Sequence, residues 1–378
     1  MKKLLIRTFI LRLTVVLLGL TSVTSLSSQV IQSTFSANGI FCTLKEGMLQ
    51  VDFVTPDIVR VQYTKEAKFV GNGTDVCVPR NQERVRFSHR KEAQHFWLKS
   101  DSLIVKVDIR TGAISYFDTN GSALLREDAM VPRVGTKVFT ERVTYDEASK
   151  RVEKTANGDI EVKTVLTRDT VGASWKYKMN FRWMPSEALY GLGSHMEDYM
   201  NLKGKELYLC QHNLKAMVPV INSTAGYGLL FDAGCSMLFR DTEEVGYVEL
   251  EAAKQIDYYF MKGKRMDAVI ANYRLLTGKS PMMPLYLFGY IQSKERYVSS
   301  DDLINTLKQF RQKQIPVNMI VQDWNYWPDG QWGRMSMNPT FYPDKKKLTD
   351  EIHAMNAKLM ISIWPNAVNS PQTDDFKQ

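Results

Sequence analysis

The sequence has few of the residues that build metal centres and disulfide frameworks. Among its 378 residues there are four cysteines and five histidines. The cysteines have none of the short paired spacings of zinc sites, and they are too few for a disulfide scaffold. We therefore expect no metal ion and no cofactor, and we interpret the cysteines as buried free thiols, with up to two disulfides as the alternative. They are Cys42, Cys77, Cys210 and Cys235.

Long runs of one charge are also missing, which limits the partners that the chain can bind. The formal net charge is +8, charged residues make up 24% of the chain, and no basic run carries interleaved aromatic residues. This pattern argues against nucleic acid as a partner and predicts a solvated surface of mixed charge. The hydrophobic content of 44% is typical of a globular protein, and the length favours two domains.

The start of the chain has the pattern of a secretory leader. Lys2 and Lys3 precede an apolar run at 13–20, and small residues follow at 25–28. Because the apolar run is too short to span a bilayer, this order predicts that residues 1–28 form a signal peptide. We expect an exported protein, periplasmic or extracellular, with no stable membrane insertion after cleavage.

Residues 29–260 alternate short apolar runs with turn signals. Turn-forming sequences such as Thr55-Pro56-Asp57 and Asn120-Gly121 separate the runs. Many short strands with frequent turns predict an antiparallel β-sandwich of two sheets. The clearest strand-like runs lie at 49–54, 58–63, 102–109, 112–117 and 159–167.

A helix and a stiff connector follow the sandwich. Residues 266–276 have helical spacing, Gly278 is placed to end that helix, and Pro281 and Pro284 come soon after. We interpret residues 261–283 as a linker helix with its connector. The second domain is therefore expected to span residues 284–378.

The second domain alternates strand and helix patterns. Apolar, strand-like runs lie at 285–290, 317–322 and 358–363, with helical spacing at 299–314 and 345–355 between them. Ser300 with Asp301 is placed to cap the first helix. This order predicts right-handed βαβ crossovers, in which functional residues lie at the carboxyl ends of the strands. The predicted ends are Tyr290, Asp323 and Trp364.

The segment around Asp323 carries the strongest chemical signal. An apolar strand leads into this carboxylate, Trp324, Tyr326 and Trp327 follow at once, and Trp332 is close behind. A sugar suits such a surface, because aromatic faces accept its C–H groups while a carboxylate binds its hydroxyls. The alternatives are that the aromatic residues fill a core and that Asp323 caps a turn.

Five short motifs share one resemblance. They are Tyr190–His195 (YGLGSH), Asn201–Lys205 (NLKGK), Phe288–Tyr297 (FGYIQSKERY), Gln322–Trp324 (QDW) and Leu359–Pro365 (LMISIWP). Together they resemble glycoside hydrolase family 31, most of all its α-xylosidase-type members. The resemblance runs in order over roughly residues 35–378. Ile291 departs from it, because a tryptophan is more usual at that position.

The resemblance implies a multidomain β + α/β fold. A galactose-mutarotase-like β-sandwich would be followed by about three βα units of a TIM (β/α)8 barrel, which takes about 250 residues when complete. Family 31 enzymes are retaining α-glycosidases with two catalytic aspartates, the first at the end of the fourth barrel strand. We therefore expect a fragment of an enzyme acting on α-xylosides or α-glucosides, with both catalytic residues beyond Gln378 and no turnover of its own.

The resemblance also implies substrate-binding roles in the second domain. Asp323 matches the carboxylate that binds sugar hydroxyls in subsite −1, and Trp364 matches an aromatic wall of the same subsite. Trp324, Tyr290 and Trp327 are further candidates for contact with the substrate, an α-linked xyloside or glucoside.

One candidate lies in the first domain. His195 follows Gly191 and Gly193 in a loop that, by resemblance, leans over the barrel mouth. The alternative is a structural, hydrogen-bonded imidazole. A competing hypothesis for the whole chain is a non-catalytic carbohydrate-binding β-sandwich protein.

Overall fold

The computed structural model of the protein describes residues 28–71, 76–78, 84–155, 158–212, 214–242, 246–331 and 334–363. The chain divides into two compact units, Met1–Lys279 and Ser280–Gln378. The predicted signal peptide, apart from Ser28, lies outside the described residues, as do Trp332 and Trp364. In the part of the chain that is described, no helix is long and apolar enough to cross a membrane.

The first sheet of the first unit has eight antiparallel strands. Their order is β1-β2-β3-β4-β18-β15-β14-β12, so the chain leaves this sheet after β4 and returns to it through β12. The strands are β1 (Val30–Phe35), β2 (Gly39–Leu44), β3 (Gly47–Thr55), β4 (Ile58–Thr64), β12 (Leu189–Ser194), β14 (Ala216–Ser223), β15 (Tyr227–Phe231) and β18 (Ile256–Lys262).

The second sheet has ten strands. Its order is β13-β16-β17-β11-β9-β8-β7-β6-β5, and β10 pairs with β11 outside this path. The strands are β5 (Ser88–Lys91), β6 (His95–Lys99), β7 (Leu103–Asp108), β8 (Ile114–Asp118), β9 (Ala123–Glu127), β10 (Arg133–Thr155), β11 (Gly158–Arg182), β13 (Glu206–Leu209), β16 (Met237–Arg240) and β17 (Gly246–Ala253).

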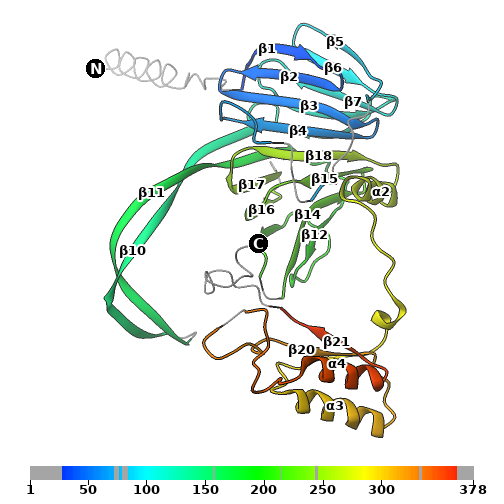
Figure 1. The fold of residues 1–378 in the computed structure, drawn as a ribbon. Coiled ribbons are helices and arrows are strands. Elements are labelled where there is room, and N and C mark those ends of the chain that lie inside the picture. The colour runs from blue at the N-terminus through cyan, green and yellow to red at the C-terminus, as the bar shows by residue number, and fades with distance from the viewer. Residues whose placement is uncertain are drawn as a thin grey trace, which may run out of the picture. The chain divides into compact units, whose positions relative to one another are not determined.

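Side chains from both sheets form one hydrophobic core. Leu49, Val51 and Phe53 are buried and alternate with more exposed residues along β3, as a strand with one buried face requires. Tyr116 of β8 and Phe260 of β18 come from different sheets and stack with ring centroids 3.9 Å apart. In Figure 1, β1–β4 lie over β5–β7 across this core. The antiparallel sandwich predicted from the sequence is confirmed.

Strands β10 and β11 extend far beyond the sandwich. Among the described residues, only Trp175–Arg182 of β11 pairs with β17 and β9, and the rest of the hairpin is a two-stranded ribbon. Figure 1 shows this ribbon as a long curved arm. The sequence predicted a strand only at 159–167. Because Phe139, at 61% exposure, and Leu166, at 60%, lie at the surface, the arm lacks the one-sided burial on which strand prediction depends.

Helix α2 (Met266–Thr277) packs on the first sheet. Val269 and Leu276 are buried in a cluster with residues of β4, β14, β15 and β18. The helix predicted at 266–276 is confirmed, and Gly278 ends it with a φ of 87°, a conformation that glycine adopts without strain. Its contacts place this helix in the first unit, although the sequence interpretation put it in a linker.

The second unit is built on a parallel sheet in the order β19-β20-β21. Leu307, Leu348 and Ile352 of its two helices share a core with Ile320 of the central strand. Both helices lie on the same side of the sheet in Figure 1. The predicted alternation of strand and helix is confirmed. The elements are β19 (Ile291–Gln292), α3 (Ser300–Gln312), β20 (Met319–Gln322), α4 (Lys345–Ala354) and β21 (Lys358–Ile361).

The first strand predicted for this unit is in the wrong place. The apolar run at 285–290 begins with a 3-10 helix, η1 (Leu285–Phe288), and β19 starts only at Ile291. Leu285 and Phe288 are 86% and 75% exposed, so their side chains lie at the surface of the unit. Periodicity could not detect this, because a short apolar run has the same composition in a strand and in other structures.

Candidate functional site

Asp323 stands at the carboxyl end of the central strand of the second unit. All four residues of β20 are buried, as expected for the middle strand of a parallel sheet. Asp323 follows as the first half-buried residue. Within the described part of the chain its carboxylate makes no hydrogen bond and no ion pair.

The aromatic residues after Asp323 divide between core and surface. Tyr326 and Trp327 are 2% and 4% exposed and belong to the core of the second unit. Trp324 is half-buried, and its ring centroid lies 6.5 Å from that of Trp327. Trp324 therefore keeps an accessible part next to Asp323. Contact of Trp327 or Trp364 with a sugar stays a prediction, since the former is core and the latter lies outside the described residues.

Tyr290 lies at the opposite end of the sheet from Asp323. Ile291 pairs with Met319, so Tyr290 is level with Asn318, whose backbone N–H donates to the Tyr290 carbonyl oxygen at 2.9 Å. Asp323 comes five residues after Asn318, a distance of about 16 Å at a rise of about 3.3 Å per residue. The prediction that Tyr290 ends a strand is wrong, because β19 begins after it.

His195 follows β12, and Gly191 and Gly193 lie within that strand at an irregularity in its pairing with β14, not in the loop that the sequence predicted. Gly191 and Gly193 have φ values of 123° and 93°, and a Cβ on them would lie 2.2 and 2.1 Å from backbone oxygens of β14. The imidazole comes directly after β12, and its ring centroid is 5.6 Å from that of Tyr199. Its Nδ1 is buried and has no hydrogen-bond partner among the described residues. The role of His195 in closing a sugar site stays a prediction.

The cysteines and the possible metal ligands can be placed in the described part of the chain. None of the four cysteines, all of which the structure describes, forms a disulfide; Cys42 is buried and the other three are partly exposed. In the described ranges, no group of three or more histidine, cysteine, aspartate or glutamate residues is arranged to hold a metal ion.

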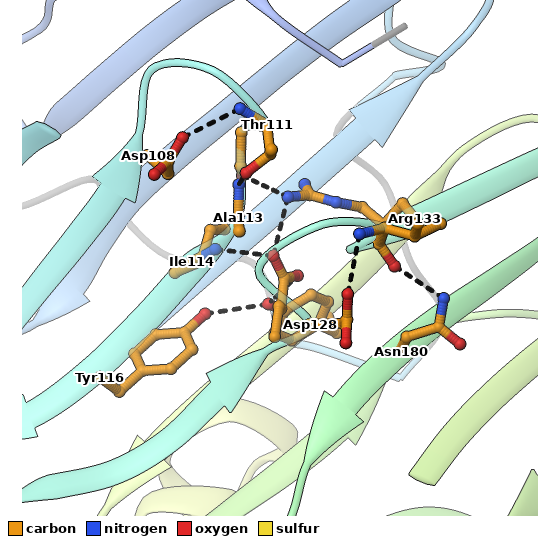
Figure 2. Close-up of polar contacts among 12 residues, drawn as sticks. Asp108, Thr111, Ala113, Ile114, Tyr116, Asp128, Arg133 and Asn180 are labelled. Carbon is orange, nitrogen blue, oxygen red and sulfur yellow. Dashed lines mark hydrogen bonds and ion pairs between the residues drawn. The ribbon is translucent and has the colours of Figure 1, made fainter. Parts of the chain in front are cut away.

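A buried ion pair in the first unit was missed by the sequence analysis. Arg133 Nη2 donates to Glu127 Oε2 at 2.8 Å, and the two side chains are 1% and 0% exposed. The backbone N–H of Ile114 donates to the same oxygen at 2.8 Å (Figure 2), and the Tyr258 hydroxyl donates to Oε1 at 3.1 Å. Because no solvent or ligand reaches this pair, its role is structural. The burial of this pair could not be predicted from residue type, since glutamate and arginine usually lie at the surface.

Family models match both units of the chain. Residues 48–239 match the glycosyl hydrolase 31 N-terminal galactose mutarotase-like domain. Residues 280–378 match the glycosyl hydrolases family 31 TIM-barrel domain. The three parallel strands of the second unit are thus the start of a TIM barrel, as the sequence predicted.

Relatives and solved structures agree with the family models. An α-xylosidase of Saccharolobus solfataricus is 30% identical over 342 residues, which cover 87% of this chain and 41% of the relative. Alpha-xylosidase A of Aspergillus niger is 27% identical over 206 residues, or 52% of this chain and 27% of the relative.

One similar solved structure is the GH31 α-xylosidase from a soil metagenome complexed with xylose. Its TM-score is 0.72 at 23% sequence identity, and the match covers 92% of this chain and 48% of the α-xylosidase chain. A Flavobacterium johnsoniae GH31 dextranase complexed with glucose has a TM-score of 0.69 at 19% identity, with 89% of this chain and 38% of that one covered. Both likenesses concern the fold. The chain spans less than two thirds of the length of each of these four proteins.

Proposed function

Because the chain belongs to glycosyl hydrolase family 31, we propose that its second unit supplies part of a pocket for the xylosyl or glucosyl residue of an α-glycoside. The names of two relatives, both α-xylosidases, support this substrate class. The soil-metagenome α-xylosidase, whose structure is a complex with xylose, supports it as well.

The observation that carries the proposal is the position of Asp323. It extends from a fully buried strand, its carboxylate has no partner in the described part of the chain, and Trp324 beside it is half-buried. A carboxylate accepts hydrogen bonds from vicinal hydroxyls, and an indole face covers the C–H groups of a sugar ring. In this proposal Asp323 binds the sugar and takes no covalent part in the reaction.

The complete enzyme is proposed to hydrolyse its substrate with retention. That reaction needs two carboxyl groups about 5–5.5 Å apart, one as nucleophile and one as acid and then base. Asp323 is the one carboxylate that directly follows a described strand of the second unit. We propose that the catalytic pair lies outside residues 1–378 and that these residues alone do not turn over substrate. Export through the leader at 1–28 is part of the same proposal.

The test uses the 378-residue chain with a substrate and a simple sugar. Release of nitrophenol from p-nitrophenyl α-xyloside and α-glucoside is expected to be undetectable. Binding of xylose and of glucose, followed by tryptophan fluorescence, should weaken about tenfold or more in Asp323→Ala, because a hydrogen bond to a charged group contributes about 1.5–3 kcal/mol. Asp329→Ala, which removes an exposed carboxylate from the same loop, should bind like wild type.

Three outcomes would change the proposal. Turnover by the chain alone would show that its catalytic residues are present. Equal sugar binding by wild type and Asp323→Ala would remove Asp323 from the site. If that binding also perturbed residues of the first unit, it would favour the carbohydrate-binding β-sandwich instead.

A further inference from the structure

Gln322 is a polar residue at the end of an apolar strand, and it is 0% exposed. Its Nε2 donates to the carbonyl oxygens of Asp323 at 2.8 Å and of Tyr297 at 3.0 Å. The Tyr342 hydroxyl lies 2.9 Å from Gln322 Oε1 and 2.7 Å from the Tyr297 oxygen. The buried amide therefore has partners at both of its polar atoms, and all of them belong to the loops beside β20.

The two peptide planes on either side of the Asp323 Cα are both held. The backbone N–H of Ser362 donates to the Gln322 carbonyl oxygen at 2.9 Å, which fixes the plane before Asp323. The Gln322 side chain holds the Asp323 carbonyl oxygen, which fixes the plane after it. With both planes fixed, the direction of the Cα–Cβ bond is set, and only the side-chain torsions of Asp323 remain free.

The tyrosines of this network are themselves anchored. The caps of α3 and α4, Ser299 and Asp344, stand two residues after Tyr297 and Tyr342, and each accepts a backbone N–H of its own helix. Tyr297 and Tyr342 are 1% and 2% exposed. Burial raises the pKa of Tyr342 to about 12, so its hydroxyl stays a hydrogen-bond donor at neutral pH.

We propose that Gln322, held by Tyr297 and Tyr342, is a positioning residue that aims the Asp323 carboxylate at the sugar. The inference rests on the proposed function, because it takes Asp323 as a sugar-binding residue. Gln322 does not touch the sugar and acts through the backbone of Asp323. A leucine in its place would leave three buried polar groups without this partner and would free the Asp323 carbonyl to rotate.

The experiment compares Gln322→Leu with a variant that only weakens packing. Xylose affinity is measured by calorimetry on the 378-residue chain, and 15N relaxation gives the order parameters of the Asp323 and Trp324 amides. Gln322→Leu should bind xylose about tenfold more weakly and lower both order parameters, since small misplacements of a site group are costly. Tyr342→Phe, which removes one hydroxyl, should have a smaller effect. Ile352→Val should lower the melting temperature and change neither readout.

The outcomes separate this inference from the proposed function. If Asp323→Ala loses xylose binding while Gln322→Leu retains it, the positioning role is wrong and the proposed function stands. The same holds if Gln322→Leu loses affinity only as much as Ile352→Val does. If Asp323→Ala binds like wild type, or if wild type does not bind xylose, the proposed function fails and the inference fails with it. Unchanged order parameters of Asp323 and Trp324 in Gln322→Leu would overturn the inference alone, because Gln322 would then not hold the Asp323 backbone.

Discussion

Removing one partner of the buried Glu127–Arg133 pair should destabilise the first unit strongly. Arg133→Met keeps most of the side-chain volume but takes away the charge that faces Glu127. The remaining donors to that carboxylate would be the neutral Ile114 N–H and Tyr258 hydroxyl. Neither of them balances a charge that is 0% exposed to water.

The magnitude follows from the burial of the pair. Breaking a buried ion pair from one side costs about 3–5 kcal/mol, because an uncompensated charge stays in the core. Glu127→Gln should cost a similar amount, since it leaves Arg133 without its anion. In the double variant no charge is left behind, and the glutamine can still accept from Ile114. We therefore expect the double variant to cost about 2 kcal/mol less than the two single variants added together.

Urea unfolding followed by near-ultraviolet circular dichroism measures this cycle. The matched control is Arg86→Met, because Arg86 and Asp101 form an ion pair at 3.3 Å whose side chains are 88% and 69% exposed. Its unfolding midpoint should equal that of wild type, as is usual for exposed pairs. Single variants that each cost less than about 1 kcal/mol, or costs that simply add in the double variant, would refute the reasoning.

Two further predictions concern titratable groups of the first unit. Burial opposes ionisation of Asp128, but the backbone amides of Val131 and Met130 and the Arg182 guanidinium outweigh it, so the pKa of Asp128 is lowered. Its stabilisation is therefore present above the unfolded pKa of about 4 and lost as pH falls through the lower folded value. Asp128→Asn should have a lower urea midpoint than wild type at pH 7, and the difference in midpoint should narrow as the pH is lowered below about 4; a difference that does not narrow would contradict this. Burial raises the pKa of the Cys42 thiol to about 12, so little reactive thiolate forms at pH 8. Alkylation at pH 8, followed by peptide mass spectrometry, should modify the partly exposed Cys210 first and Cys42 only on unfolding. Equal alkylation rates at the two cysteines would count against this prediction.

Much of the sandwich could be predicted because its strands have one buried face. Along β3 the buried residues Leu49, Val51 and Phe53 recur at every second position, and turn sequences mark both ends. The arm formed by β10 and β11 has no such face over most of its length. Its strands are held together by backbone pairing, from Arg133 with Met179 to Thr155 with Gly158, and residue type records little of that.

The candidate site was predictable in part for a similar reason. Asp323 was found because an apolar run ends at it, and that run is the buried strand β20. Tyr290 was wrongly predicted to end a strand because β19 has only two residues. The predicted strand ended where β19 begins, so an error of a few residues put Tyr290 at the wrong end of the strand. Trp327 was predicted to contact the substrate because it lies close to Asp323 in the sequence. Tryptophan is common both in cores and at ligand sites, and the structure places Trp327 in the core of the second unit.

The position of Asp323 follows from neighbouring residues in the sequence, whereas its orientation depends on residues that are far apart in the sequence. The sequence predicted a helix cap at Ser300 with Asp301, and the structure places the cap one residue earlier, at Ser299, so a local rule came within one residue. Gln322, by contrast, reaches Tyr297 across 25 positions, and Tyr297 reaches Tyr342 across 45. No local pattern encodes such pairs, because a Gln or Tyr has the same propensities with or without its distant partner. A carboxylate at a strand end can therefore be predicted from the sequence. The residues that orient it are identified only in the folded structure, where the loops that precede α3 and α4 lie beside β20.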